Sequence, residues 1–199
     1  MLTNILLLLN SILYLGPTLL DGQLDGGGPM HRNIINWGAD RASALANGEY
    51  YRLLTSTFLH ANLSHFVLNM YSLYNLGPGL EKLLGSDRLG IIYILSGLAG
   101  SIGTYIIGPL LGQNTNISSV GASGAIFGLL GTWIVYIALN PDYFQSGALT
   151  QILFITVLNI GFGFYANSLG NSGSMIGNAA HIGGLVAGMI MGYIFTAVI

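Results

Sequence analysis

The stretch Val120-Gly121-Ala122-Ser123-Gly124-Ala125-Ile126-Phe127-Gly128 decides how this sequence is interpreted. It places one serine between glycines, where the polar run from Gln113 to Ser119 changes to an apolar segment that ends near Leu139. A serine in that setting either belongs to a closely packed helix start or is an exposed nucleophile. The choice depends on what the rest of the chain brings to Ser123.

The composition indicates a membrane protein. Only 6% of the 199 residues are charged and 52% are hydrophobic, whereas soluble domains are about 25% charged. Apolar windows long enough to cross a bilayer as helices lie at 2–20, 57–79, 89–111, 122–140, 148–168 and 177–198. We therefore expect an all-α polytopic membrane bundle of six transmembrane helices, which forms a single domain over residues 1–199.

The same composition excludes several classes of function. Cysteine is absent, so disulfides and thiolate catalysis do not arise. The net charge of -2 offers no basic face for nucleic acid. The segment from Met1 lacks the basic start and the small-residue cleavage site of a secretory signal, so we expect it to remain as a transmembrane helix. Basic residues are spread over both of the first two loops, so the positive-inside rule does not set the orientation.

Two connections are candidates for functional loops. The longer one, at about 21–56, carries the aromatic residues Trp37, Tyr50 and Tyr51 together with Arg52. This mixture is typical of structures that lie in the membrane interface, although a plain linker is the alternative. The second connection, at about 166–177, is rich in Gly, Ser and Asn, and is either a lid or an ordinary loop.

The second apolar window carries polar side chains on one helical face. His65 and Asn69 are four residues apart, which places them on the same side of a helix. Lipid penalises such groups, so this face is expected to point into the bundle or towards water. They either form structural hydrogen bonds with neighbouring helices or serve a site.

The last window combines a histidine with a groove of glycines. His181 shares a helical face with Gly184, Gly188 and Gly192, and Gly124 and Gly128 form a similar small-residue pair beyond Ser123. Such faces allow helix backbones to approach closely. Because one helix separates these two segments, Ser123 and His181 are expected near the same membrane surface, where the histidine would act as the base that a serine nucleophile needs.

This arrangement predicts a dyad and not a triad. All seven acidic residues lie outside the predicted helices, and none is close in sequence to His181. Phe127, one turn after Ser123, is placed to stack on the imidazole and orient it, as an aspartate does elsewhere. His65, Asn69 and the backbone N–H of Ser123 are the candidate donors to an oxyanion.

Together these segments resemble the rhomboid family of intramembrane serine proteases. The similarity extends from about residue 35 to residue 195 and includes Gly121 to Gly124 with Phe127 and Gly128, His65 with Asn69, and Ala180-His181 with its glycines. Tyr51-Arg52 is similar to the family's aromatic-arginine pair, with tyrosine where tryptophan is usual, and Phe127 stands where some members have tyrosine.

The resemblance implies roles for these positions. Ser123 would be the nucleophile and His181 the general base and acid, with His65, Asn69 and Ser123 forming the oxyanion hole. Gly121, Phe127 and Arg52 would be supporting residues. The enzyme would need no cofactor or metal and would cut single-pass transmembrane proteins in the lipid bilayer. Its expected location is the plasma membrane, with the site open to the extracytoplasmic side.

Two other functions compete with this one. A non-catalytic rhomboid-like protein would bind membrane clients without cutting them, but such a protein would be expected to have lost Ser123 or His181. A metal or proton transporter would use His60, His65 and His181 as ligands, yet no carboxylate or thiolate lies within a predicted helix to complete such a site.

Overall fold

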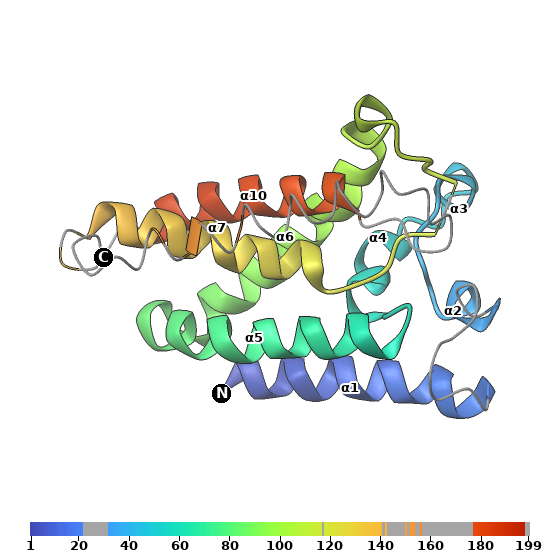
Figure 1. Cartoon of the computed structure of the whole chain (residues 1–199), viewed down its shortest axis with the longest axis horizontal. Coiled ribbons are helices and arrows are strands. Elements are labelled where there is room, and N and C mark those ends of the chain that lie inside the picture. Colours follow the sequence, from blue (N-terminus) through green and yellow to red (C-terminus); the bar gives the residue numbers. More distant parts are fainter. Residues whose placement is uncertain are drawn as a thin grey trace.

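The computed structural model describes residues 1–21, 32–116, 118–140 and 177–197, together with positions 142, 150, 152, 153 and 156. Five of the helices in this part of the chain have 17 residues or more: α1 (Leu2–Asp21), α5 (Leu63–Leu84), α6 (Ser86–Ile106), α7 (Ser123–Leu139) and α10 (Asn178–Thr196). Short helices connect them: α2 (Arg32–Asn36), α3 (Ala42–Ala46), α4 (Arg52–Thr55), η1 (Ser56–Phe58) and η2 (Pro109–Leu111). Figure 1 shows α1 and α5 side by side, with α6 crossing behind α7 and α10.

Three described helices are long and apolar enough to cross a membrane: Leu2–Leu20, Ser86–Ile106 and Asn178–Thr196. The shorter α7 is apolar as well. The predicted windows at 2–20, 122–140 and 177–198 therefore correspond closely to helices. The predicted fifth helix at 148–168 and the predicted lid at 166–177 lie almost wholly outside the described residues, so the count of six spans stays a prediction.

Three predicted boundaries were wrong. The window at 57–79 ends too early, because α5 continues through Pro78 to Leu84 and so contains Glu81, which was expected outside the helices. The window at 57–79 contains a helix that begins only at Leu63, because Ser56–Phe58 forms a separate 3-10 turn and the Asn62 side chain caps α5 by accepting from the His65 N–H at 2.8 Å. The window at 89–111 ends too late, since α6 stops at Ile106 before the Pro109–Leu111 turn. Hydropathy averaged over a window does not register caps or short turns.

The carboxylate of Glu81, at the end of α5, holds the beginning of α1. It accepts hydrogen bonds from the backbone N–H groups of Leu2 and Thr3 and from the hydroxyls of Thr3 and Ser86. The first amides of a helix have no partner within that helix, so Glu81 supplies one across the bundle. Its two backbone partners belong to α1, which runs antiparallel to α5 (Figure 1).

Glycines bring α6, α7 and α10 into backbone contact, as the sequence predicted. A Cβ atom on Gly184 or Gly188 would overlap the backbone of Gly124 or Gly128, respectively. Thr132 Oγ1 donates to the carbonyl oxygens of Gly128 and Gly188, both at 3.0 Å. With no hydrophobic driving force between helices in lipid, such close packing and interhelical hydrogen bonds hold a bundle together. They also fix the register between α7 and α10.

Candidate active site

Ser123 is the first residue of α7 and is half-buried. The helical hydrogen bond from the Ile126 N–H to the Ala122 carbonyl is 2.9 Å long, and the amides of Ser123, Gly124 and Ala125 precede it. Amides in the first turn of a helix are free to donate to a ligand, and the helix dipole adds partial positive charge there. Ser123 therefore combines a hydroxyl with backbone donors suited to developing negative charge.

Gly121 turns the chain into this position. Its φ of 129° is one that residues with side chains rarely adopt, and its N–H donates to the Ser56 carbonyl at 2.9 Å. A Cβ atom on Gly121 would lie 2.5 Å from Cε1 and 2.7 Å from Nε2 of His65. Gly121 is thus required both by its backbone conformation and by the His65 ring that packs against it. This contact places the His65 ring against a residue that lies two positions before Ser123 in the chain.

His181 lies in the first turn of α10, where it is 8% exposed. Its ring stacks on Phe127 of α7, with centroids 4.2 Å apart and an interplanar angle of 10°. The stacking that we expected between these two rings is therefore present. Its Nδ1 atom is buried and has no hydrogen-bond partner. The aromatic contact is accordingly what restrains the ring in this structure.

The backbones beside Ser123 and His181 meet against α6. A Cβ atom on Gly100 would lie 2.9 Å from the Ala180 carbonyl oxygen and 3.2 Å from Gly124 Cα. Ala180 and Gly124 directly adjoin His181 and Ser123, so the two candidate residues share one end of the α7 and α10 pair. No hydrogen bond joins their side chains in this structure. Catalytic hydrogen bonds often tighten only when substrate is bound.

The two candidate oxyanion residues differ in their surroundings. His65 faces Gly121, as described above. Asn69 is 5% exposed and donates one amide hydrogen to the His65 carbonyl at 2.9 Å, within α5. An amide group carries a second hydrogen, so the bond to the helix leaves Asn69 one donor. The predicted inward orientation of Asn69 is confirmed by its burial, whereas its catalytic role stays a prediction.

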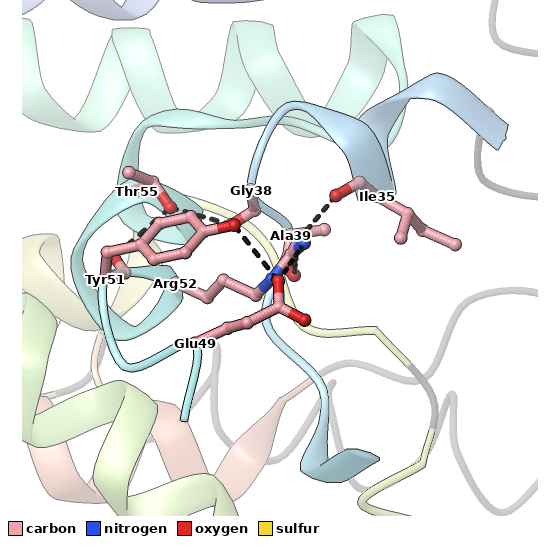
Figure 2. Close-up of polar contacts among 7 residues, drawn as sticks. All are labelled: Ile35, Gly38, Ala39, Glu49, Tyr51, Arg52 and Thr55. Atoms are coloured by element: carbon pink, nitrogen blue, oxygen red, sulfur yellow. Dashed lines mark hydrogen bonds and ion pairs between the residues drawn. The ribbon is translucent and has the colours of Figure 1, made fainter. Parts of the chain in front are cut away.

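Arg52 supports the loop before α5 and is not part of the Ser123 and His181 pair. Its guanidinium donates to the carbonyl oxygens of Ile35 and Ala39 and forms an ion pair with Glu49 at 2.6 Å (Figure 2). Hydrogen bonds from Arg52 and then from Tyr51 lower the pKa of the partly exposed Glu49 carboxyl. Arg52 itself is 7% exposed. Part of the loop predicted at 21–56 is therefore folded around a buried cation, and the alternative of a plain linker is wrong for residues 32–56.

Two buried polar residues near this site are His60, which the sequence offered only as a metal ligand, and Asn178, which it did not single out. The His60 ring is 5.4 Å from that of His65 between centroids, and both of its nitrogens are buried without a partner. Asn178, one turn before His181, is 1% exposed with both amide atoms unpartnered. A single polar residue ahead of an apolar helix gives no sequence signal of burial. Among the described residues, no group of three or more His, Cys, Asp or Glu side chains is placed to hold a metal ion.

Apolar helices of spanning length and a small-residue seam define an integral membrane protein of the all-helical class. Residues 47–198 match the Rhomboid domain family. The chain is 37% identical to rhomboid protease GluP of Bacillus subtilis (strain 168) over 83% of its own length and 30% of that protein. It is 35% identical to the putative rhomboid protease YdcA of the same organism, over 75% of this chain and 69% of YdcA.

Plant proteins are similar as well. RHOMBOID-like protein 5 of Arabidopsis thaliana is 34% identical over 84% of this chain and 51% of that protein. The chain thus spans about a third of GluP and about half of this plant relative. The family match covers most of the chain, and YdcA is matched over two thirds of its length. The chain belongs to the rhomboid family.

Proposed function

We propose that this protein is a serine endopeptidase that hydrolyses peptide bonds in or next to the transmembrane segments of single-pass membrane proteins. The observation that carries the proposal is the meeting of the α7 and α10 starts, where Ser123 adjoins the helix contact and His181 is stacked on Phe127. GluP and YdcA are named as a rhomboid protease and a putative one, which is consistent with this activity.

The proposed mechanism uses the Ser123 and His181 pair. His181 takes the proton of the Ser123 hydroxyl as the oxygen attacks the scissile carbonyl carbon, and then gives that proton to the leaving amine. Water then cleaves the acyl-enzyme in the same way. It passes a proton to His181 as it attacks, and His181 returns that proton to the Ser123 oxygen as the carboxylic acid product leaves. Burial and stacking of the imidazole keep its orientation through both steps.

The oxyanion formed in each step needs hydrogen-bond donors. The backbone N–H of Ser123 lies at the start of α7, and the side chains of His65 and Asn69 come from α5. His65 packs on Gly121, close to the chain segment that carries the nucleophile. Donors fixed before the reaction stabilise the developing charge without having to reorganise.

The substrate must unfold locally before it is cut. A peptide bond in a lipid-embedded helix is protected by its own hydrogen bonds and by the absence of water. We propose that substrates have small residues at the cleavage point and helix-weakening residues nearby, and that they enter laterally from the bilayer. The proposed location is the plasma membrane, with the site open to the extracytoplasmic side.

The decisive experiment compares the wild type with Ser123→Ala and His181→Ala in detergent. A model single-pass substrate is incubated with each purified variant. The matched control is Ser72→Ala, which replaces a half-buried serine on α5 whose hydroxyl donates to the Leu68 carbonyl. We expect cleavage by the wild type and the control only, and covalent labelling of Ser123 by a fluorophosphonate. Equal cleavage by Ser123→Ala would refute the dyad. Substrate binding without cleavage by the wild type would favour the non-catalytic client-binding alternative.

A further inference from the structure

Asp40 is a buried acid that the proposed mechanism does not use. Its side chain is 0% exposed, and neither carboxyl oxygen has a hydrogen-bond partner. The hydroxyl of Tyr105, near the end of α6, is likewise buried without a partner. A buried polar group that lacks a hydrogen bond is costly, so the Asp40 carboxyl and the Tyr105 hydroxyl, which interact with each other, call for an explanation.

The backbone at Asp40 is joined to the segment that leads to Ser123. The Asp40 N–H donates to the Ser119 carbonyl at 3.1 Å, and the Ser119 N–H donates to the Asp40 carbonyl at 2.7 Å. A third bond runs from the Ala42 N–H to the Thr115 carbonyl at 3.1 Å. Only Val120, Gly121 and Ala122 separate this bridge from Ser123, so the bridge anchors the chain shortly before the serine.

The groups around Asp40 act on its charge in opposite directions. Burial raises the pKa of the Asp40 carboxyl above its ordinary value of 3.8, and this is the largest effect. The Tyr105 hydroxyl, the Arg41 backbone N–H and the Arg52 charge oppose it, in that order. The Arg52 guanidinium is already committed to Glu49 and to the Ile35 and Ala39 carbonyls. Burial is thus the dominant effect, and it shifts the carboxyl group towards its uncharged form relative to a free aspartate.

We propose that Asp40 is a positioning residue for Ser123. In this role the Asp40 carboxyl group is uncharged and forms a hydrogen bond with the Tyr105 hydroxyl. A protonated carboxyl group both donates and accepts, so one pair satisfies both orphaned groups and ties the 39–42 loop to α6. The bridge to Ser119 then holds the approach to the nucleophile in register. This inference rests on the proposed protease function, and it adds a residue of the first loop to those that support the activity.

The experiment uses three variants, Asp40→Asn, Asp40→Ala and Tyr105→Phe. Asparagine retains an uncharged donor and acceptor of the same shape, whereas alanine leaves Tyr105 unpartnered. We expect Asp40→Asn to keep kcat within about threefold, and Asp40→Ala to lower kcat about tenfold or more with little change in KM, because positioning acts on the transition state. Tyr105→Phe should lower kcat as well, and adding Asp40→Ala to it should have little further effect.

Two readouts without catalysis separate this proposal from the proposed function. Hydrogen exchange of the peptide that covers 116–124 should rise in Asp40→Ala and not in Asp40→Asn, even if the wild type cuts nothing. Stability in a Ser123→Ala background should fall as the pH rises from about 4 to the native pKa of Asp40, because the native state then binds more protons than the unfolded state. Asp40→Asn should lack that decline. The proposal would be overturned if stability varied with pH in the same way with and without Asp40→Asn. It would also be overturned if hydrogen exchange of the 116–124 peptide were unchanged in Asp40→Ala.

Discussion

The imidazole ring of His181 lies flat on the phenyl ring of Phe127, with the ring centroids 4.2 Å apart. The two rings come from α10 and α7, so the contact depends on the register of those helices. His181 Nδ1 has no hydrogen-bond partner, whereas an acid fixes this atom in a catalytic triad. In the proposed dyad, ring stacking takes over that orienting task.

Removing this stacking should therefore reduce turnover. Aromatic pairs contribute about 0.5–1.5 kcal/mol beyond burial, so we expect Phe127→Leu to lower kcat roughly 3- to 10-fold with a smaller change in KM. Phe127→Tyr retains the aromatic ring, so its kcat should stay within about twofold of the wild-type value. Steady-state cleavage of a model substrate measures both variants. Equal rates for Phe127→Leu and Phe127→Tyr would show that stacking does not orient the base.

The oxyanion donors can be tested separately. Loss of one donor typically costs about 10²–10³ in kcat, so we expect Asn69→Ala to reduce turnover by about 10- to 1000-fold. Asn75→Ala is a matched control because Asn75 is exposed and bonds the carbonyl four residues before it in α5, as Asn69 does. An Asn69→Ala enzyme as fast as the control would remove Asn69 from the oxyanion hole.

The seam between α7 and α10 should not tolerate a side chain. A Cβ atom on Gly188 would overlap the Gly128 backbone, whereas one on Gly177 would have an ordinary contact of 3.5 Å with Ala180. Overpacking costs about 1–3 kcal/mol, so we expect Gly188→Ala to lower the thermal midpoint in detergent by several degrees and Gly177→Ala to leave it nearly unchanged. Similar midpoints for the two variants would contradict the close packing of these helices.

Glu81 should be important for stability and not for chemistry. Alanine at this position would leave two backbone amides at the start of α1 without a partner, at roughly 1–3 kcal/mol for each buried group. We expect Glu81→Ala to lower the thermal midpoint, whereas Lys82→Ala, at the neighbouring position, should not. The Glu81→Ala protein that remains folded should have the wild-type kcat. A reduced kcat in fully folded protein would assign Glu81 a further role.

The first loop should weaken in acid. Arg52 holds the pKa of Glu49 below its ordinary value of 4.5. A lowered native pKa means that this pair contributes stability above about 4.5 and loses it as the pH falls through the native value. The effect should be small because the Glu49 side chain is 34% exposed and solvent screens the pair. Glu49→Gln should therefore show slightly less acid destabilisation than the wild type, whereas Arg52→Ala should expose the loop to proteolysis at every pH. A loop that resists protease in Arg52→Ala would contradict its anchoring role.

Some of the site could be predicted because its signals are local. The spacing of His181, Gly184 and Gly188 defines one helical face, and the structure packs those glycines against Gly124 and Gly128. Helical periodicity fixes which residues share a face before any partner is known. The same reasoning placed Phe127 one turn after Ser123, where a ring can reach the neighbouring helix.

Other contacts carried no such signal. Glu81 binds Thr3 across 78 positions of the chain, and the bridge between Asp40 and Ser119 spans a similar separation. Neither the sequence spacing nor the hydropathy of these residues identifies the partner. The beginning of α5 at Leu63 was also missed, since an apolar window does not distinguish a 3-10 turn from a helix.

The sequence by itself determined the class of this protein. Its lack of charge requires helices that satisfy their own backbone in lipid, and its small-residue faces require close packing of some of them. Only the tertiary structure decided which groups face one another: His181 on Phe127, His65 on Gly121, and Asp40 beside Tyr105. The physical reason is that periodicity is a property of each helix alone, whereas a buried polar group takes its partner from whichever element the packing brings alongside.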